Sequence, residues 1–120
     1  MKYNYVYKIT NKESGKQYIG TRSSKICPYD DIGIKYFSSS KDKEFIQEQK
    51  EKPELYEYQI LYGFETRMEA LEYEIYLHNF YDVGKNPMFY NRAKQTSVGF
   101  DRSGIIGEKS LWVLQKKYQS

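Results

Sequence analysis

An alternation of tyrosines near the N-terminus constrains the fold more than any other feature of this chain. Within residues 3–10, aromatic or aliphatic side chains at every second position alternate with mostly polar ones, which is the pattern of a half-buried strand. The polar residues 11–15 end in glycine and supply turn chemistry, and residues 16–21 return as a second strand. A four-residue loop between the strands would place Tyr7 opposite Tyr18. The sequence therefore predicts a β-hairpin with two phenols side by side on one face.

An alternative interpretation of this hairpin is a tyrosine-rich sheet surface, because 14 of the 120 residues are tyrosine. The length corresponds to one domain with a modest core. The single cysteine, Cys27, excludes an intrachain disulfide and a cysteine-based zinc site. The N-terminus lacks the apolar run of a signal peptide, and no segment has the roughly 18 apolar residues of a membrane span. We therefore expect a soluble, cytoplasmic protein without a membrane partner.

Charge is distributed unevenly along the chain, although the net charge is only +3. Residues 1–50 carry ten basic and six acidic side chains, residues 51–80 two and seven, and residues 81–120 seven and three. An acidic centre between two basic segments is suited to a cation site whose surroundings contact phosphate. Charge blocks of this kind are also found on ordinary solvated surfaces.

The rest of the chain divides into further segments with recognisable patterns. The serines at 38–40 are candidate N-caps for a helix that runs to about residue 50, before Pro53. Residues 55–62 alternate as a third strand. Thr66 and Glu69 form a capping box, so we expect a helix from there to about residue 81. Residues 22–37 and 82–87 are predicted as irregular, 97–107 as a linker, and 111–114 as a short apolar element.

The helix after Thr66 contains one glutamate in an unusual position. At about 100° per residue, Glu74 falls on the same arc as the apolar side chains, whereas Glu69 and Glu72 point the other way. A carboxylate on a packed face costs free energy unless it is paired or bound to a cation. Two explanations remain open for Glu74: a metal ligand, or a buried salt bridge with Arg22 or Arg67. The apolar arc comprises Met68, Ala70, Leu71, Ile75, Leu77 and His78.

The ordered set of these motifs resembles the GIY-YIG nuclease family, and most of all its phage-encoded homing-type endonucleases. The first motif is Tyr5-Val6-Tyr7, in which Tyr5 stands where the family usually has glycine, and the second is Tyr18-Ile19-Gly20. The acidic helix, Asn86-Pro87 and Phe89-Tyr90-Asn91 resemble the second half of the same domain. The resemblance covers roughly the first hundred residues.

The resemblance implies a divalent-metal-dependent endonuclease acting on double-stranded DNA. It implies that Glu74 binds the metal, Mg²⁺ or another divalent cation such as Mn²⁺, since Mg²⁺ prefers one or two carboxylates and several waters. It also implies that Tyr7 accepts a proton from the attacking water, with Tyr18 as its hydrogen-bonding neighbour. A phenol titrates near pH 10, so nearby positive charge would have to lower the pKa of Tyr7.

The cation that stabilises the transition state is less clearly placed. Many relatives carry an arginine on a helix about three turns after the second motif, whereas this chain has Arg22 directly after Gly20. Arg22 is the expected residue, because a guanidinium suits phosphate geometry. Lys35 and Lys41 are the candidate substitutes. An ordinary surface arginine is the alternative.

The remaining candidates lie late in the chain. Asn91 matches the family's supporting asparagine. His78 lies one turn after Glu74 and is either an auxiliary group or, more ordinarily, a packed structural histidine. Arg92, Lys94 and Arg102 mix with aromatic residues, as on surfaces that track a nucleic-acid backbone.

Together these observations predict an α+β fold with a small, three-stranded, largely antiparallel sheet flanked by helices. Residues 1–96 would form the nuclease-like domain and 97–120 a basic, linker-like tail. If phage-encoded, the protein would act in the host cytoplasm. Two other classes remain: a catalytically inactive nucleic-acid-binding domain with the same fold, and an interaction domain with a tyrosine-rich face. The target sequence, the oligomeric state and the choice between nicking and double-strand cleavage are not encoded in any motif we recognise.

Overall fold

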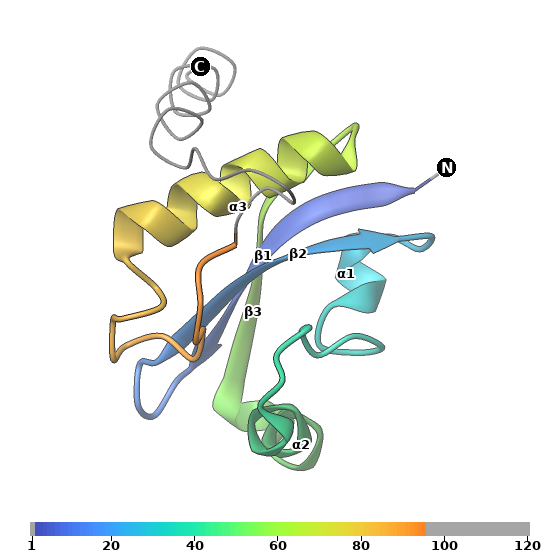
Figure 1. Ribbon diagram of the computed structural model, residues 1–120. Coiled ribbons are helices and arrows are strands. Elements are labelled where there is room, and N and C mark those ends of the chain that lie inside the picture. Colours follow the sequence, from blue (N-terminus) through green and yellow to red (C-terminus); the bar gives the residue numbers. More distant parts are fainter. Residues whose placement is uncertain (1, 96–120) are drawn as a thin grey trace.

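The computed structural model describes residues 2–95. The predicted linker, the apolar element at 111–114 and Arg102 lie outside the described residues. Three antiparallel strands form one sheet in the order β2-β1-β3 (Figure 1). The elements in chain order are β1 (Tyr3–Asn11), β2 (Gln17–Ser24), α1 (Pro28–Asp31), α2 (Lys43–Glu51), the 3₁₀ turn η1 (Pro53–Leu55), β3 (Tyr56–Phe64) and α3 (Arg67–Tyr81). The predicted α+β class with a three-stranded sheet is confirmed.

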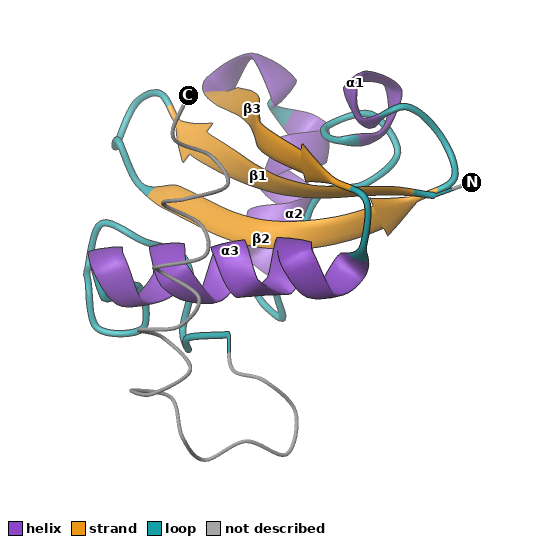
Figure 2. Cartoon of the chain, turned by 90° about the horizontal axis from the view of Figure 1, so that it is seen from above, coloured by secondary structure: helices purple, strands orange, loops and turns teal. Residues whose placement is uncertain are grey.

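Helices cover both faces of the sheet. Figure 1 places α3 on one side, and α1 and α2 on the other. Seen from above in Figure 2, α3 runs along the strands, beneath β2 in that view. Two apolar clusters result, which we call the tyrosine face and the α3 face. The tyrosine face comprises Tyr5, Tyr7, Ile9, Tyr18, Ile32, Phe45 and Tyr56. The α3 face comprises Val6, Ile19, Phe64, Ala70, Leu77, Val83 and Phe89.

Strand β1 is the central strand, and this corrects the expectation that it is half-buried. Every residue from 4 to 7 is buried. Successive side chains point to opposite faces of the sheet, and helices cover both faces. The alternation in the sequence separates two packed faces rather than a packed face from a solvated one.

The hairpin register also differs from the prediction. Tyr7 lies opposite Gly20 and Tyr18 opposite Ile9, two residues away from the expected pairing. The reason is Asn11, whose N–H donates to the Lys16 carbonyl at 2.8 Å, so that the loop begins one residue later in the chain than predicted. The Asn11 side chain accepts hydrogen bonds from the N–H groups of Glu13 and Ser14. A shift of two residues keeps each side chain on its face, so Tyr7 and Tyr18 remain neighbours.

The helix caps follow local chemistry, with one correction. Thr66 caps α3 and accepts a hydrogen bond from the N–H of Glu69 at 3.2 Å, as predicted. The cap of α2 is Asp42 rather than one of the serines at 38–40, and its carboxylate accepts hydrogen bonds from two backbone N–H groups in the first turn. A second error concerns Met68, which is 61% exposed and not on the packed arc.

The outer edge of β2 is covered by the segment that follows α3. Gln17 forms a parallel bridge with Phe89, its N–H donates to the Met88 carbonyl, and its own carbonyl accepts from the Tyr90 N–H. This pairing brings the end of the described chain beside the hairpin. It thereby places Asn91 next to the second motif.

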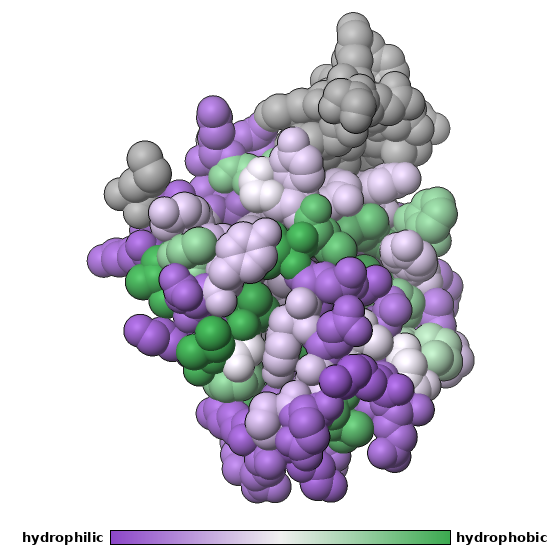
Figure 3. All heavy atoms as spheres, turned by 180° about the vertical axis from the view of Figure 1, so that it is seen from behind, coloured by the Kyte–Doolittle hydropathy of each residue, from purple (hydrophilic) through white to green (hydrophobic). Residues whose placement is uncertain are grey.

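The surface shows apolar groups in several separate places. On the side seen in Figure 3, hydrophobic side chains lie among hydrophilic ones. Within residues 2–95, no helix combines the length and the apolar character needed to cross a bilayer.

Candidate active site

The two motif tyrosines pack together over Gly20. Tyr7 is fully buried and Tyr18 nearly so, and their rings stack with centroids 6.2 Å apart. A Cβ atom at position 20 would lie 2.4 Å from Tyr7 Oη and 2.7 Å from Cζ. Only glycine leaves room there, which explains sterically why the Tyr-Ile-Gly motif ends in glycine.

The hydroxyl groups of this pair are weakly hydrogen-bonded and keep their protons. Tyr7 Oη donates to Tyr36 Oη at 3.5 Å, and Tyr18 Oη lies 3.4 Å from Ser39 Oγ. Burial raises the pKa of Tyr7 well above 10, and Tyr36, Tyr18 and Glu74 add to this effect. Burial also raises the pKa of Tyr18 to about 12. The lowered Tyr7 pKa that a general base would need is therefore not produced by the described residues.

Glu74 is buried on the α3 face, as its position on the helix predicts. It is 5% exposed, and its Oε1 accepts a hydrogen bond of 2.8 Å from Thr21 Oγ1. Burial raises the pKa of Glu74 to about 7, against the lowering effects of the Thr21 hydrogen bond and the Arg67 charge. The alternative explanation, a salt bridge of Glu74 with Arg22 or Arg67, does not occur among the described residues, because Arg22 pairs with Asp31 and Arg67 donates to Ser23.

His78 is a neutral structural partner of β2. Its Nδ1 accepts from the N–H of Gln95 at 2.7 Å, so the proton lies on Nε2, which is 2.8 Å from the Ile19 carbonyl. Nε2 is also 3.5 Å from Glu74 Oε2. Burial lowers the pKa of His78, so this contact is not an ion pair at neutral pH.

Asn91 holds the backbone of the second motif from outside the sheet. Its Oδ1 accepts from the N–H of Ile19 at 3.1 Å, and its Nδ2 donates to the Ile19 carbonyl at 2.9 Å. The side-chain amide thus replaces a neighbouring strand at the β2 edge. This positioning role agrees with burial of Asn91 and requires no contact with a reacting group.

The candidate residues lie on opposite faces of β2. Tyr7 and Tyr18 lie on the tyrosine face, whereas Thr21 and Glu74 lie on the α3 face. In the described chain Tyr7 and Glu74 share no hydrogen bond, but the Glu74 charge contributes to the raised pKa values of both tyrosines. The two sets meet β2 at neighbouring residues, because Tyr7 and Tyr18 pack over Gly20 and Glu74 accepts a hydrogen bond from Thr21.

Arg22 lies on the tyrosine face, since it is the cross-strand partner of Tyr5. Its Nε donates to Asp31 Oδ2 at 3.1 Å, and its Cζ is 4.2 Å from the centroid of the Tyr36 ring. The side chain remains 35% exposed. Arg22 is therefore a partly accessible cation whose orientation is set by Asp31 and Tyr36, and not an ordinary surface arginine.

The other basic candidates are more exposed. Lys35 and Lys41 are exposed and form no ion pair with another described residue. Arg92 pairs with Asp42 at 3.2 Å, and Lys94 with Asp82 at 2.9 Å. The basic residue of such a surface pair can change its partner at little cost, because the pair contributes roughly 0–1 kcal/mol to stability.

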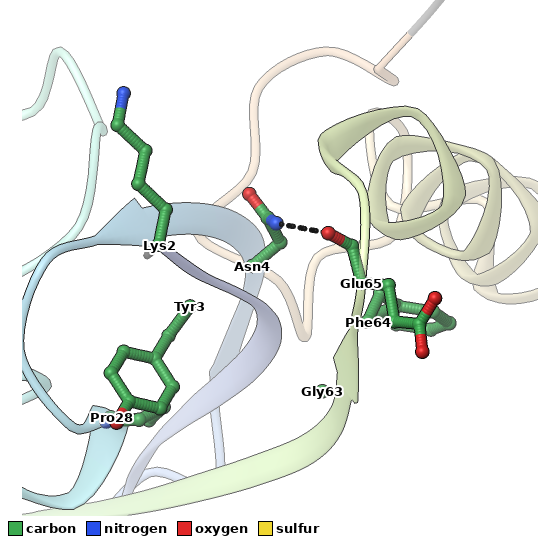
Figure 4. A pocket seen from close by; sticks show the side chains of 7 residues that line it. All are labelled: Lys2, Tyr3, Asn4, Pro28, Gly63, Phe64 and Glu65. Atoms are coloured by element: carbon green, nitrogen blue, oxygen red, sulfur yellow. Dashed lines mark hydrogen bonds between the residues drawn. The ribbon is translucent and has the colours of Figure 1, made fainter.

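A cavity of about 510 Å³ lies at the N-terminal end of β1, and none of the candidate site residues lines it. Figure 4 shows it between the start of β1 and the end of β3, with the Asn4 side chain hydrogen-bonded to the Glu65 carbonyl. Its lining residues are Lys2, Tyr3, Asn4, Pro28, Gly63, Phe64 and Glu65. The candidate site is instead a polar network along β2.

Three members of this network were missed by the sequence analysis: Thr21, Asp31 and Tyr36. Asp31 is 1% exposed, although it stands in a segment that we predicted to be irregular. The only available signal was its proximity to Arg22 in the chain. Its burial depends on α1 packing against β1, which no local pattern predicts.

Compared with family models, curated proteins and solved structures, the chain shows no match. The class that its fold defines is a small α+β domain with a three-stranded antiparallel sheet. Function is therefore argued from the site alone.

Proposed function

We propose that this protein is a divalent-metal-dependent DNA endonuclease with a GIY-YIG-like fold, of the phage homing type. The observation that carries the proposal is the placement of the candidate residues at neighbouring positions of β2. Two stacked tyrosines pack over Gly20 on one face, and on the opposite face the buried Glu74 carboxylate accepts a hydrogen bond from Thr21. Arg22 lies on the tyrosine face of the same strand.

Glu74 is suited to hold Mg²⁺ or Mn²⁺. Its pKa of about 7 indicates that the Arg67 charge and the Thr21 hydrogen bond only partly offset the burial of the carboxylate, and a divalent cation would offset it further. No group of three or more His, Cys, Asp or Glu side chains with the geometry of a metal site occurs in the described part of the chain. Water and phosphate would therefore complete the coordination, as is usual for Mg²⁺. A bound ion would neutralise phosphate charge during hydrolysis.

The chain's own residues then have distinct roles. Tyr7 Oη holds its proton, because its pKa is raised. It could accept a proton from water only as the phenolate, after additional positive charge had lowered its pKa and its own proton had passed to solvent. Tyr18 packs against Tyr7 and limits its rotation. The outward nitrogens of Arg22 can bind a phosphate oxygen. Asn91 and His78 keep the backbone of Ile19 in place.

Double-stranded DNA is the proposed partner. Arg92 and Lys94 are each paired with an aspartate across an exposed contact, so a phosphate can replace that aspartate. Arg102, outside the described residues, is a further candidate for phosphate contact. Binding of this kind is strongly dependent on salt.

A second candidate function is a nucleic-acid-binding domain without catalysis. Two observations favour it: the Tyr7 pKa is raised rather than lowered, and Asp31 pairs with Arg22. Both functions predict binding to DNA, and only the first predicts hydrolysis.

The deciding experiment is a nicking assay on supercoiled plasmid with Mg²⁺ and with EDTA. We expect nicking with Mg²⁺ and none with EDTA. In Mg²⁺, Glu74→Gln should nick at least about 10²-fold more slowly than the parent. The matched control is Glu72→Gln, on the same helix but only half-buried, which should cut at nearly the parent rate. Binding without nicking would favour the inactive domain. Equal loss in both variants, or nicking in EDTA, would refute the metal assignment.

A further inference from the structure

The carboxylate of Asp31 joins β1, β2 and α1 through a single oxygen atom. Tyr5 Oη donates to Asp31 Oδ2 at 2.8 Å, and Arg22 Nε donates to the same Oδ2 at 3.1 Å. Asp31 is 1% exposed and Tyr5 is fully buried. A charged group buried to this extent needs such partners, so its geometry is well determined.

This arrangement orients the guanidinium of Arg22. Its inward donor, Nε, is used by Asp31, and its plane is supported by the Tyr36 ring, 4.2 Å from Cζ to the centroid. Among the described residues, the hydrogen bonds of Arg22 are confined to Nε. The Nη1 and Nη2 donors of the partly exposed side chain therefore remain for another acceptor.

The same platform is connected to the candidate proton acceptor. Tyr36 Oη receives the hydrogen bond of Tyr7 Oη at 3.5 Å, while the Tyr36 ring supports Arg22. Tyr36 thus contacts both the Arg22 cation and the Tyr7 phenol, and its ring also packs edge-on against the Tyr7 ring with centroids 5.8 Å apart.

We propose that Tyr5 and Asp31 are positioning residues, which hold Arg22 so that its Nη donors meet a non-bridging phosphate oxygen of the DNA substrate. The inference rests on the proposed endonuclease function. It also explains the Tyr5 hydroxyl, which is the second donor to Asp31 Oδ2 and keeps the carboxylate from rotating away from Nε. A carboxylate with Arg22 as its only partner could rotate and would hold the guanidinium loosely.

The alternative is a merely structural role, in which the Tyr5–Asp31 hydrogen bond stabilises the fold and has no effect on Arg22. The two roles differ in their coupling. A structural role predicts that loss of the Tyr5 hydroxyl lowers stability whether or not Arg22 is present. A positioning role predicts that its effect on the rate requires Arg22.

The test compares Tyr5→Phe and Asp31→Asn with Tyr58→Phe under single-turnover cleavage of a duplex oligonucleotide with Mg²⁺. Tyr58 is the matched control, because it lies on the same face and donates a hydrogen bond of 2.9 Å to Gln49, remote from Arg22. We expect Tyr5→Phe to cut about 10- to 10²-fold more slowly at saturating DNA, since small misplacements of a catalytic group have effects of that size. Tyr58→Phe should cut at the parent rate, and its melting temperature should be similar to that of Tyr5→Phe.

The double variant Tyr5→Phe/Arg22→Ala separates positioning from structure. We expect it to cut no more slowly than Arg22→Ala alone. The proposal is overturned if Tyr5→Phe cuts at the control rate, or if it reduces the rate of Arg22→Ala as much as that of the parent.

An NMR measurement distinguishes failure of this inference from failure of the endonuclease proposal. The Arg22 Nε–H signal should exchange with water much more slowly than that of Arg92, whose side chain is 78% exposed, and Tyr5→Phe should accelerate it. A parent that shows this protection but cuts no DNA refutes the nuclease and leaves the Arg22 geometry established. Equal exchange at Arg22 and Arg92 refutes the positioning role whatever the cleavage result.

Discussion

Gly20 is the residue on which the candidate site depends most directly. The Tyr7 phenol occupies the space where any other residue would place its Cβ atom, and Tyr18 packs beside it. Glycine is therefore selected here by close approach and not by an unusual backbone angle.

Replacement of Gly20 by alanine tests this dependence. The added methyl would lie 2.4 Å from Tyr7 Oη, so Tyr7 must move and the core must adjust, which costs about 1–3 kcal/mol of unfolding free energy. We also expect plasmid nicking to slow. Gly63→Ala is the matched control, because nothing lies within 4 Å of a Cβ atom there. Urea denaturation of both variants gives the comparison, and equal stabilities would contradict the steric argument.

The buried carboxylate of Glu74 gives a second prediction, made without divalent ions. Burial raises its pKa from 4.5 to about 7, so the folded protein binds this proton more tightly than the unfolded chain. Its contribution to stability is therefore present at low pH and is lost as pH rises from about 4.5 to 7. The loss amounts to about 3 kcal/mol.

Glu74→Gln isolates this effect, because glutamine does not titrate and His78 remains in both proteins. Relative to the parent, the Gln variant should gain stability as pH increases from 4.5 to 8 in EDTA. Denaturant unfolding at several pH values measures the difference. A difference that does not change with pH would show that Glu74 ionises normally.

At the level of elements, the edge of β2 is completed by residues that follow it much later in the chain. Asn91 supplies both a donor and an acceptor to Ile19, and the adjacent backbone of residues 88–90 pairs with Gln17. The second motif is thus held from outside by residues about 70 positions later in the chain. An exposed edge would leave these backbone groups open to other strands.

Asn91→Ala should therefore destabilise the protein by about 1–3 kcal/mol, because the buried N–H of Ile19 loses its partner while the Ile19 carbonyl keeps its contact with His78. Amide exchange at Ile19 should accelerate by more than that of the rest of β2. Asn79→Ala is a suitable control, since Asn79 is exposed and bonds only within its own helix. If both variants unfold at the same urea concentration, Asn91 is not the edge-completing residue.

For the whole molecule, the distribution of charge predicts how DNA binding responds to salt. Combined replacement of Arg92, Lys94 and Arg102 by glutamine should weaken binding. It should also flatten the slope of log K against log salt by at most about 3, because each phosphate contact contributes roughly 0.9. The reduction should fall short of that limit, since Arg92 and Lys94 first exchange an aspartate for the phosphate.

Fluorescence anisotropy with a labelled duplex at several salt concentrations measures this slope. Lys52→Gln, an exposed change within the acidic central segment, should leave both affinity and slope unaltered. A salt-independent affinity, or an unchanged slope in the triple variant, would contradict a role for the basic segments.

Local sequence patterns predicted those features that depend on a few neighbouring residues. The tyrosine alternation predicted β1, the capping box predicted the start of α3 at Thr66, and helical periodicity placed Glu74 on the buried face. Each of these signals arises from interactions within one turn or along one strand. Such interactions are the same in almost any fold, so they are readable before the fold is known.

Only the tertiary structure decided how these elements meet. The hairpin register moved by two residues because the Asn11 side chain closed the turn. Thr21 meets Glu74 across 53 positions and Ile19 meets Asn91 across 72, while Asp31 became buried only when α1 packed on the sheet. A hydrogen bond between distant residues depends on the simultaneous position of every intervening element. No residue pattern near either partner contains that information.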